Sequence, residues 1–278
     1  MSRYIATLIL IVLFIQSSLS QQVNCDAYKQ DSLYYKACLK YTKACKYFQG
    51  AKESQIMLDE VVEICPYFGD AYYVKAIPYL KRGDFITWKK LIDMAVEYAP
   101  EDYLGYRGGC RFMFLRDYKG AINDIEHLIT FSNNDIGYIY NGDYHLKIIL
   151  ALSYKGIGNK KKAIAIIENQ LSTNEYEAGL YDYLHLGVLK LEVNNYDEAI
   201  LLLNKQIKIN DYVAETYYYL ALAFKKKGNE QFYIENLKKS KEYFLQGKEL
   251  PGSNSFMDYM DKVYLVLINE ELESSFVK

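Results

Sequence analysis

The chain has 278 residues, 51% of them hydrophobic, which is enough to bury a substantial core in one large domain or in an elongated repeat array. It contains only 4 prolines and 16 glycines against 30 tyrosines, and this composition favours helices over a turn-rich β architecture. The formal net charge is −2 and charges of both signs are interspersed, so we expect no nucleic-acid partner.

Residues 1–20 have the pattern of a secretory signal peptide. Arg3 supplies a positive charge, Ile5 to Ile15 is an almost uninterrupted apolar run, and Ser18-Leu19-Ser20 offers small residues for cleavage. An uncleaved anchor is the first alternative, but a membrane span needs about 20 apolar residues and this run is shorter. A lipoprotein signal ending before Cys25 is the second alternative, and the absence of a small residue directly before that cysteine disfavours it. We therefore expect an exported chain without a membrane span after cleavage.

Five cysteines are concentrated in the N-terminal part, at positions 25, 38, 45, 65 and 110. Export would allow disulfides, and an odd number leaves at least one thiol unpaired. Cys38 and Cys45 fall seven residues apart on one expected helix, roughly 10 Å, which is too far to bridge. Cys38 with Cys65, facing each other across a helical hairpin, is the pair that we favour. The alternative is that all five are small buried hydrophobic residues. Without a C-x-x-C motif, neither zinc nor redox chemistry is indicated.

One pattern recurs along the chain. In residues 69–100, apolar residues at helical spacing lie on both sides of a tight turn, Gly83-Asp84-Phe85, and the second helix ends at Pro100. The recurring positions in this stretch are Tyr72, Ala76, Tyr79, Trp88, Ile92 and Ala95. The arrangement returns around the turns Asp117-Tyr118, Gly158-Asn159, Asn195-Tyr196 and Gly228-Asn229, at a period of roughly 33 to 36 residues.

This pattern resembles the tetratricopeptide repeat family, in which the first helix of each hairpin (helix A) carries a small residue that permits close packing. The resemblance implies an all-α, right-handed α-solenoid of about six helical hairpins with a C-terminal capping helix. The expected organisation is a signal peptide (1–20), an N-terminal segment (21–34), a solenoid (35–250) with repeats 35–68, 69–101, 102–143, 144–179, 180–213 and 214–250, and a capping helix and tail (251–278). Trp88 and Tyr233 depart from the family pattern, because a small residue is usual at both positions.

Two stretches do not fit the regular period. Residues 133–143 make the third repeat longer, and their aromatic content is expected to pack over a hairpin, with a functional loop as the alternative. After Pro251-Gly252, one helical stripe is predicted to cover the exposed end of the solenoid. It contains Phe256, Met260, Val263, Tyr264 and Leu267.

Motifs for catalysis are missing from the sequence. There is no H-E-x-x-H, G-x-S-x-G, Walker-type loop or G-x-G-x-x-G, and the three histidines are scattered over three repeats. The glycine-rich stretch Gly105 to Gly109 falls inside an expected helix A. We therefore predict no enzyme activity, cofactor, metal or catalytic residue, although two carboxylates meeting in space could still make an all-helical hydrolase.

Stacked hairpins leave a concave groove lined by helix A residues, and here the resemblance places many tyrosines in it. The candidate ligand-binding residues are Tyr73, Tyr103, Tyr106, Arg107, Phe114, Tyr181, His185, Tyr218 and Tyr219. Tyrosine suits both peptide recognition and stacking on sugar rings, although with 30 tyrosines some will pack between repeats. Family members that clamp peptide C-termini use Lys, Asn and Arg, and only Arg107 matches, since the other positions are Leu39, Lys43 and Val74.

These observations predict an exported scaffold or adaptor, a monomer or weak homo-oligomer, that binds a protein or peptide in the groove. The alternative is a carbohydrate-binding accessory protein that uses the same tyrosines. The chain has no N-x-Ser/Thr glycosylation site, which favours the bacterial periplasm or cell surface over eukaryotic secretion.

Overall fold

The computed structural model describes residues 23–132, 135–251 and 259–276, and the predicted signal peptide lies outside them. Within these residues the regular structure is helical, apart from one isolated β-bridge between Tyr138 and His145. The all-α fold predicted from the sequence is therefore confirmed. No helix in the described part is long and apolar enough to cross a membrane. The chain forms two compact units, Met1–Ala99 and Pro100–Lys278.

In its described residues, 23–99, the first unit has two helical hairpins and a short 3-10 helix. Its elements are η2 (Cys25–Tyr28), α2 (Ser32–Ala44), α3 (Lys52–Ile64), α4 (Gly69–Lys81) and α5 (Phe85–Tyr98). Helix α2 packs on α3, and α4 packs on α5. The core around α2 is made of small residues and a few large ones, which lets the helices approach closely. Its buried members include Ala37, Ala44, Leu58, Val61, Phe68 and Ala71.

The disulfide predicted between Cys38 and Cys65 is wrong, because Cys38 is bonded to Cys25. Their Cα atoms lie 5.6 Å apart, within the usual range for a disulfide. Helix η2 packs against α2 and brings Cys25 to Cys38, a contact that the expectation of a separate N-terminal segment overlooked. Cys65 is a free thiol, fully buried in the same core. The alternative of five buried thiols is also wrong, since Cys45 is exposed.

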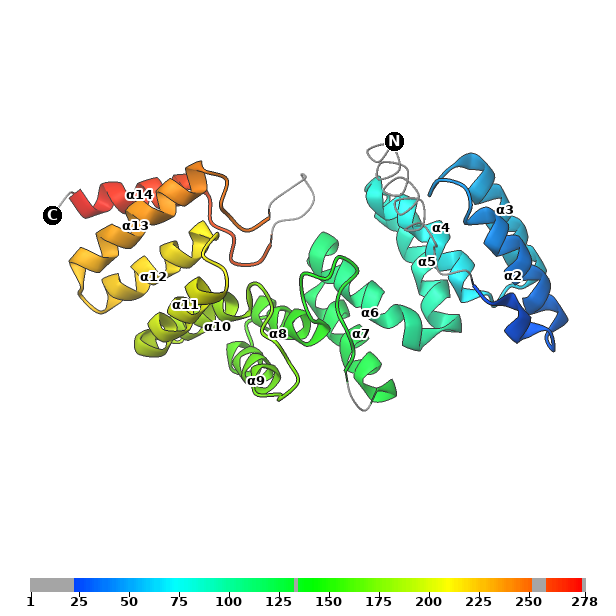
Figure 1. Cartoon of the computed structure of the whole chain (residues 1–278), viewed down its shortest axis with the longest axis horizontal. Helices are drawn as coiled ribbons and strands as arrows, with labels where there is room; N and C mark the ends of the chain where they lie inside the picture. Colours follow the sequence, from blue (N-terminus) through cyan, green and yellow to red (C-terminus); the bar gives the residue numbers. More distant parts are fainter. Residues whose placement is uncertain (1–22, 133–134, 252–258, 277–278) are drawn as a thin grey trace, which may run out of the picture. The chain divides into compact units, whose positions relative to one another are not determined.

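The second unit continues the hairpins and ends in an additional helix. Its elements are α6 (Pro100–Cys110), the π-helical turn η3 (Arg111–Leu115), α7 (Tyr118–Phe131), α8 (Leu146–Gly156), α9 (Lys160–Leu171), α10 (Asp182–Glu192), α11 (Tyr196–Ile209), α12 (Ala214–Lys226), α13 (Glu230–Leu245) and α14 (Leu265–Phe276). The pairs α6–α7, α8–α9, α10–α11 and α12–α13 are hairpins, and helix α10 also contacts α8 and α12. Helix α14 lies beside α13 (Figure 1).

Five connections in the described residues share one local conformation. Each has a residue with positive φ, followed by an Asp or Asn whose side chain accepts the backbone N–H three residues later and caps the next helix. The positive-φ residues are Gly83, Arg116, Gly158, Asn194 and Gly228, and the caps are Asp84, Asp117, Asn159, Asn195 and Asn229. The turns predicted from the recurring Gly, Asp and Asn positions are thus confirmed.

The C-terminal helix begins later than the sequence predicts. Residues 259–264 are not helical, and α14 starts at Leu265, while Phe256 lies outside the described residues. Ile268 and Leu272 of α14 are buried against Tyr233 and Leu237 of α13, so this helix does cover the end of the last hairpin. The residues before it, Tyr259 to Val263, contact side chains of helices α8, α10 and α12.

Candidate functional site

The nine candidate groove residues are not all open to solvent. Four are buried, with at most 9% of their surface exposed: Tyr103, Tyr181, His185 and Tyr218. The other five, Tyr73, Tyr106, Arg107, Phe114 and Tyr219, are partly exposed. Tyr73 lies on α4 in the first unit, whereas the rest lie in the second unit. The expectation of an open tyrosine-lined wall therefore needs correction, and the segments that cover these residues define the site.

Of the insertion predicted at residues 133–143, the described part (135–143) packs on helix α6 and η3. The ring of Tyr140 stacks on Phe114 at 6.2 Å between centroids and meets Tyr106 edge-on at 6.1 Å. Ile139 is buried, and its Cγ2 lies 3.0 Å from the position that a Cβ would take on Gly109. The insertion thus packs over a hairpin, as expected from its aromatic content, and it occupies the surface where Tyr106 and Phe114 were expected to bind a ligand.

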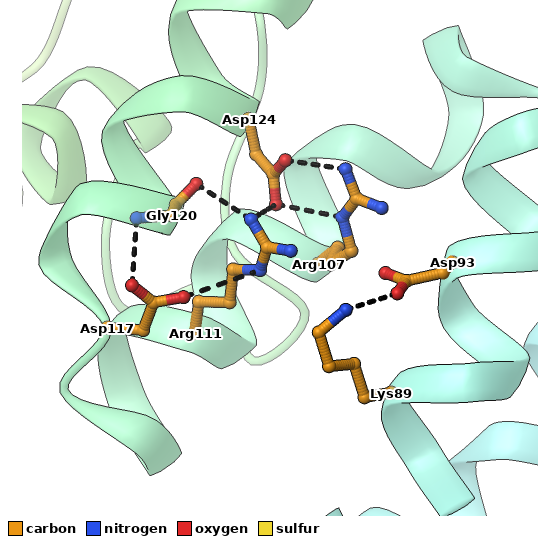
Figure 2. A network of polar contacts seen from close by, with 7 residues as sticks. All are labelled: Lys89, Asp93, Arg107, Arg111, Asp117, Gly120 and Asp124. Atoms are coloured by element: carbon orange, nitrogen blue, oxygen red, sulfur yellow. Dashed lines mark hydrogen bonds and ion pairs between the residues drawn. The ribbon is translucent and has the colours of Figure 1, made fainter. Parts of the chain in front are cut away.

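Arg107, the one residue that matched the peptide clamp, is bonded within the second unit (Figure 2). Its Nε and Nη2 donate to the two carboxylate oxygens of Asp124 on α7, at 2.9 and 2.6 Å. Arg111 adds a contact of 3.1 Å to Asp124 and donates to the carbonyl of Gly120 at 3.2 Å. The Asp124 side chain is fully buried, and both arginine side chains are only 13% exposed. This network ties α6 and η3 to α7 through a buried, bidentate ion pair.

Residues 259–263, here called the C-terminal segment, lie across helices α8, α10 and α12. We call the side of these three helices that contacts them the helix-A face. Tyr259 is 5% exposed, and its ring lies 5.6 Å from that of Tyr144 and 6.3 Å from that of Tyr181. Its hydroxyl donates to Asp143 of the insertion. The segment is therefore held at its first residue by two aromatic rings and a carboxylate.

Asp261 is the most deeply engaged residue of the C-terminal segment. Its carboxylate accepts from Lys155 Nζ of α8 at 2.5 Å and from His185 Nδ1 of α10 at 2.7 Å. A carboxylate can only accept, so Nδ1 of His185 carries a proton, while Nε2 lies 3.0 Å from the Tyr144 hydroxyl. Lys155 also pairs with Glu192 at 3.0 Å. The side chains of Lys155, His185 and Asp261 are all less than 10% exposed.

The electrostatics and the backbone both mark Asp261 as specialised. Burial acts to raise the pKa of its carboxyl, but the charge of Lys155 and the hydrogen bond from His185 outweigh burial and hold that pKa below its ordinary value. The residue adopts φ of 67°, a left-handed conformation that is uncommon for residues other than glycine but is tolerated by Asp. Asp261 thus combines a left-handed backbone with a buried charge that is paired with two basic side chains.

Glu215 of α12 holds the backbone of the C-terminal segment. It is fully buried, and its carboxylate accepts from the backbone N–H of Leu250 at 2.9 Å and of Val263 at 3.4 Å. Burial raises the pKa of Glu215, although these N–H groups and Lys262 work in the opposite direction. The Val263 side chain is 2% exposed and joins the core that contains Tyr218. Glu215 therefore connects two separate stretches of the C-terminal part, at Leu250 and at Val263, to helix α12.

Sequence reasoning did not find the residues that matter most here. Lys155, Glu215, Tyr259 and Asp261 were not among the candidates, whereas His185 and Tyr181 were, and the structure brings those two next to Tyr259 and Asp261. The available signal was weak. Lys155 and Glu215 are charged residues within otherwise apolar helix A stretches, and nothing in the sequence says which acid or amide would meet them.

The helix-A face consists of paired charges and aromatic rings. Lys155 is paired with Asp261, and an aromatic ring lies beside Tyr259. The buried carboxylate of Glu215 accepts hydrogen bonds from backbone N–H groups. In the described residues, no group of three or more His, Cys, Asp and Glu side chains is placed to hold a metal ion.

Comparisons with known proteins identify the fold. No protein-family profile and no curated protein matches the chain. Among solved structures, PilW, described as a widely conserved type IV pilus biogenesis factor, is 13% identical, with 87% of this chain and 98% of that chain covered at a TM-score of 0.58. PilF of Pseudomonas aeruginosa is 14% identical, with 75% and 92% covered and a TM-score of 0.56. YrrB, described as a TPR protein with an unusual peptide-binding site, is 16% identical, with 69% and 98% covered and a TM-score of 0.52.

A further match is a chain of the APC/C hetero-tetramer Cut9–Hcn1, of which this chain spans 44% at 13% identity and a TM-score of 0.55. Identities this low establish a fold and nothing more. The fold of this chain is that of the tetratricopeptide repeat, as its recurring turns and small residues predict.

Proposed function

We propose that this protein is a protein-interaction scaffold that binds a peptide segment of its partner on the helix-A face of the second unit. One observation carries the proposal: a non-helical segment of the chain already lies across α8, α10 and α12, held by side chains of all three helices. The segment turns at Met260 and Asp261, and the face contacts both its side chains and its backbone. A peptide in the same turned conformation could make the same contacts. The peptide-binding site named for YrrB supports the same use of the fold.

The proposed role is binding and not catalysis. Asp261 accepts from Lys155 and His185, and Glu215 accepts from two backbone N–H groups. These groups are arranged to hold a chain in place.

Export is part of the proposal. The signal-like pattern of residues 1–20 supports it, and so does the Cys25–Cys38 disulfide, since disulfides persist in oxidising compartments such as the bacterial periplasm. N-terminal sequencing of the protein purified from its native host tests it. A mature chain that begins near residue 21 is the expected result, and a chain that retains residues 1–20 would contradict export through a cleaved signal.

The binding role is tested by comparing two lysine variants in the native host. Lys155→Met removes a buried cation from the helix-A face, and Lys208→Met removes an exposed one from α11 as a matched control. After chemical crosslinking and affinity purification, we expect a partner that copurifies with the wild type and with Lys208→Met and is lost with Lys155→Met. Identical partners for all three chains, with unchanged helicity, would contradict binding at this face.

A second candidate function is saccharide binding, and a specific cavity favours it. A cavity of about 570 Å³ lies between the insertion, the start of α8 and the end of α9, lined by Asp135, Tyr138, Lys147, Gln170, Thr173, Glu175 and Tyr176. Gln170 is only 5% exposed, and its Oε1 has no hydrogen-bond partner among the described residues. Amide, carboxylate and tyrosine side chains around one cavity suit a neutral sugar.

A glycan array separates this candidate from the first. Binding by the wild type that is lost on Gln170→Leu, and kept on Lys155→Met, would assign the cavity to a saccharide. An array without any bound glycan would remove the candidate.

A further inference from the structure

The C-terminal segment makes, within the same chain, the contacts that a bound peptide would make on the helix-A face. Resting on the proposed function, we propose that residues 259–263 are an internal competitor for the peptide site. The partner then carries the same pattern: a tyrosine, an aspartate two residues later, and a branched aliphatic residue two residues after that.

The tyrosine position is defined by the shape and polarity around Tyr259. Two aromatic rings, those of Tyr144 and Tyr181, contact the Tyr259 ring, and the Tyr259 hydroxyl donates to Asp143. Asn141 Nδ2 lies 3.4 Å from the same oxygen. Phenylalanine would lose the hydrogen bond to Asp143, although Asp143 would still accept from Asn141 Nδ2 at 2.7 Å, so tyrosine is favoured by this one hydrogen bond.

The aspartate position selects for charge. If the C-terminal segment leaves, Lys155 and the N–H of His185 lose the carboxylate that they share, and Lys155 retains only Glu192 among its contacts described above. A buried cation that loses one of two carboxylate partners is destabilised, so an incoming acid is favoured over an amide or an apolar residue. The pattern thus requires an acidic residue between two hydrophobic ones.

The aliphatic position and the backbone contact complete the pattern. Val263 belongs to the buried core that also contains Tyr218, Ala221 and the α14 residues Ile268 and Leu272. Its N–H is accepted by Glu215, a contact that any residue except proline can make. This contact orients the segment without adding sequence preference.

Exchange of the C-terminal segment does not require the fold to open. Helix α14 has its own anchors, Ile268 and Leu272 in the core and Glu271, which accepts from Lys225 and from Tyr233 at 2.6 Å each. Tyr259 joins the segment to Asp143, Tyr144 and Tyr181, which precede α8 and α10, and Asp261 joins it to α8 and α10 themselves. Buried ion pairs contribute little net stability because desolvation offsets their attraction, so the contacts of Asp261 can be traded for equivalent ones.

Competition in the same chain has a measurable consequence. A tethered ligand reaches an effective concentration on the order of 1 mM, so a free peptide with a Kd of about 1 μM for the open site would bind the wild type roughly 1,000-fold more weakly. Weakening the internal ligand should restore affinity for the free peptide, whereas weakening the face should not.

Fluorescence anisotropy with a labelled peptide tests this. The probe is Tyr-Met-Asp-Lys-Val-Tyr-Leu, the sequence of residues 259–265, and the control peptide has Asn in place of Asp. The full chain is used as wild type and with Tyr259→Ala plus Asp261→Asn. We expect the double variant to bind the probe at least roughly tenfold more tightly than the wild type and more tightly than the control peptide. Adding Lys155→Met should abolish the gain, and adding Lys208→Met should leave it.

Two results would overturn the proposal. One is a folded double variant, with wild-type circular dichroism, that binds the probe no better than the wild type. The other is equal binding of the probe and the control peptide. In either case the C-terminal segment is a structural element only.

A second measurement avoids the variants altogether. Hydrogen exchange of the wild-type chain with the unlabelled probe at about 2 mM should accelerate residues 259–263 and leave α13 unchanged. Exchange that is unaltered by the peptide would also count against competition. Failure here while Lys155→Met still removes a partner in the native host would reject the internal competitor and keep the proposed function. The reverse pattern would reject the proposed function.

Discussion

In the turns between helices, a residue with positive φ is less unfavourable when it is glycine than when it carries a side chain. Gly158 has φ of 84°, and a Cβ built on it would meet no atom within 4 Å, so Gly158→Ala changes only the backbone conformation. Because the left-handed region is unfavourable for L-residues, we expect a loss of about 1 kcal/mol in the free energy of unfolding. Urea denaturation followed by circular dichroism measures it, with Lys161→Ala on the exposed face of α9 as the control. A neutral Gly158→Ala would contradict the turn geometry.

Cysteine reactivity reports the disulfide and the burial of two thiols. Cys45 is exposed, whereas Cys65 and Cys110 have no exposed surface. Burial raises the pKa of all three thiols, so access to the reagent separates them. Iodoacetamide should therefore modify Cys45 alone in the native protein and all three after unfolding. Cys25 and Cys38 should react only after reduction. Intact-mass spectrometry counts the labels, and five labels in denaturant without reductant would rule out the Cys25–Cys38 bond.

The hairpin of α6 and α7 depends on one buried carboxylate. Asp124→Ala would leave the guanidinium groups of Arg107 and Arg111 largely buried without this partner, so we expect a loss of about 3 kcal/mol. Asp117→Ala removes a half-exposed carboxylate that caps α7 and should cost about 1 kcal/mol. Denaturant unfolding of the two variants gives both values, and similar losses would mean that the buried pair adds little.

Elements could be predicted from the sequence where their signals are local. The hairpins follow from apolar spacing and from turns such as Gly83-Asp84, because both the period and the cap are set within a few residues. The C-terminal segment could not be predicted in this way. Asp261 meets Lys155 over a separation of 106 residues and His185 over 76, and no local rule selects those partners.

The candidate site was half predictable for the same reason. Helix A register placed Tyr181 and His185 on the correct face, since it depends only on the repeat. Their burial depends on which segment covers that face. The residues that do so, Tyr259 and Asp261, were assigned to a helical cap because Met260, Val263, Tyr264 and Leu267 also fit a helical stripe.

In the second unit as a whole, the C-terminal segment joins three hairpins, so its charges should influence the stability of the entire unit. Asp261→Asn keeps an acceptor for His185 but removes the charge next to Lys155, and we expect a loss of about 2 kcal/mol at pH 7. The pKa of Asp261 is lowered in the folded chain from an ordinary value near 3.8. Its contribution is therefore complete above that pH and disappears as the pH falls through the folded pKa. The wild type should lose its advantage over Asp261→Asn only in this acidic range.

Glu215 provides a comparison of opposite sign in the same unit. Burial raises its pKa above the ordinary value near 4.5, so the folded state prefers the protonated form and loses stability as the pH rises from that value through the folded pKa. Glu215→Gln carries no charge and loses one good acceptor at every pH. The free energy of unfolding of Glu215→Gln, relative to that of the wild type, should thus increase as the pH rises over that window. That of Asp261→Asn, relative to the wild type, should decrease as the pH rises from the acidic range. Urea unfolding between pH 2.5 and about 7 measures both trends, and parallel pH profiles for the two variants would show that these carboxylates do not hold the C-terminal segment as described.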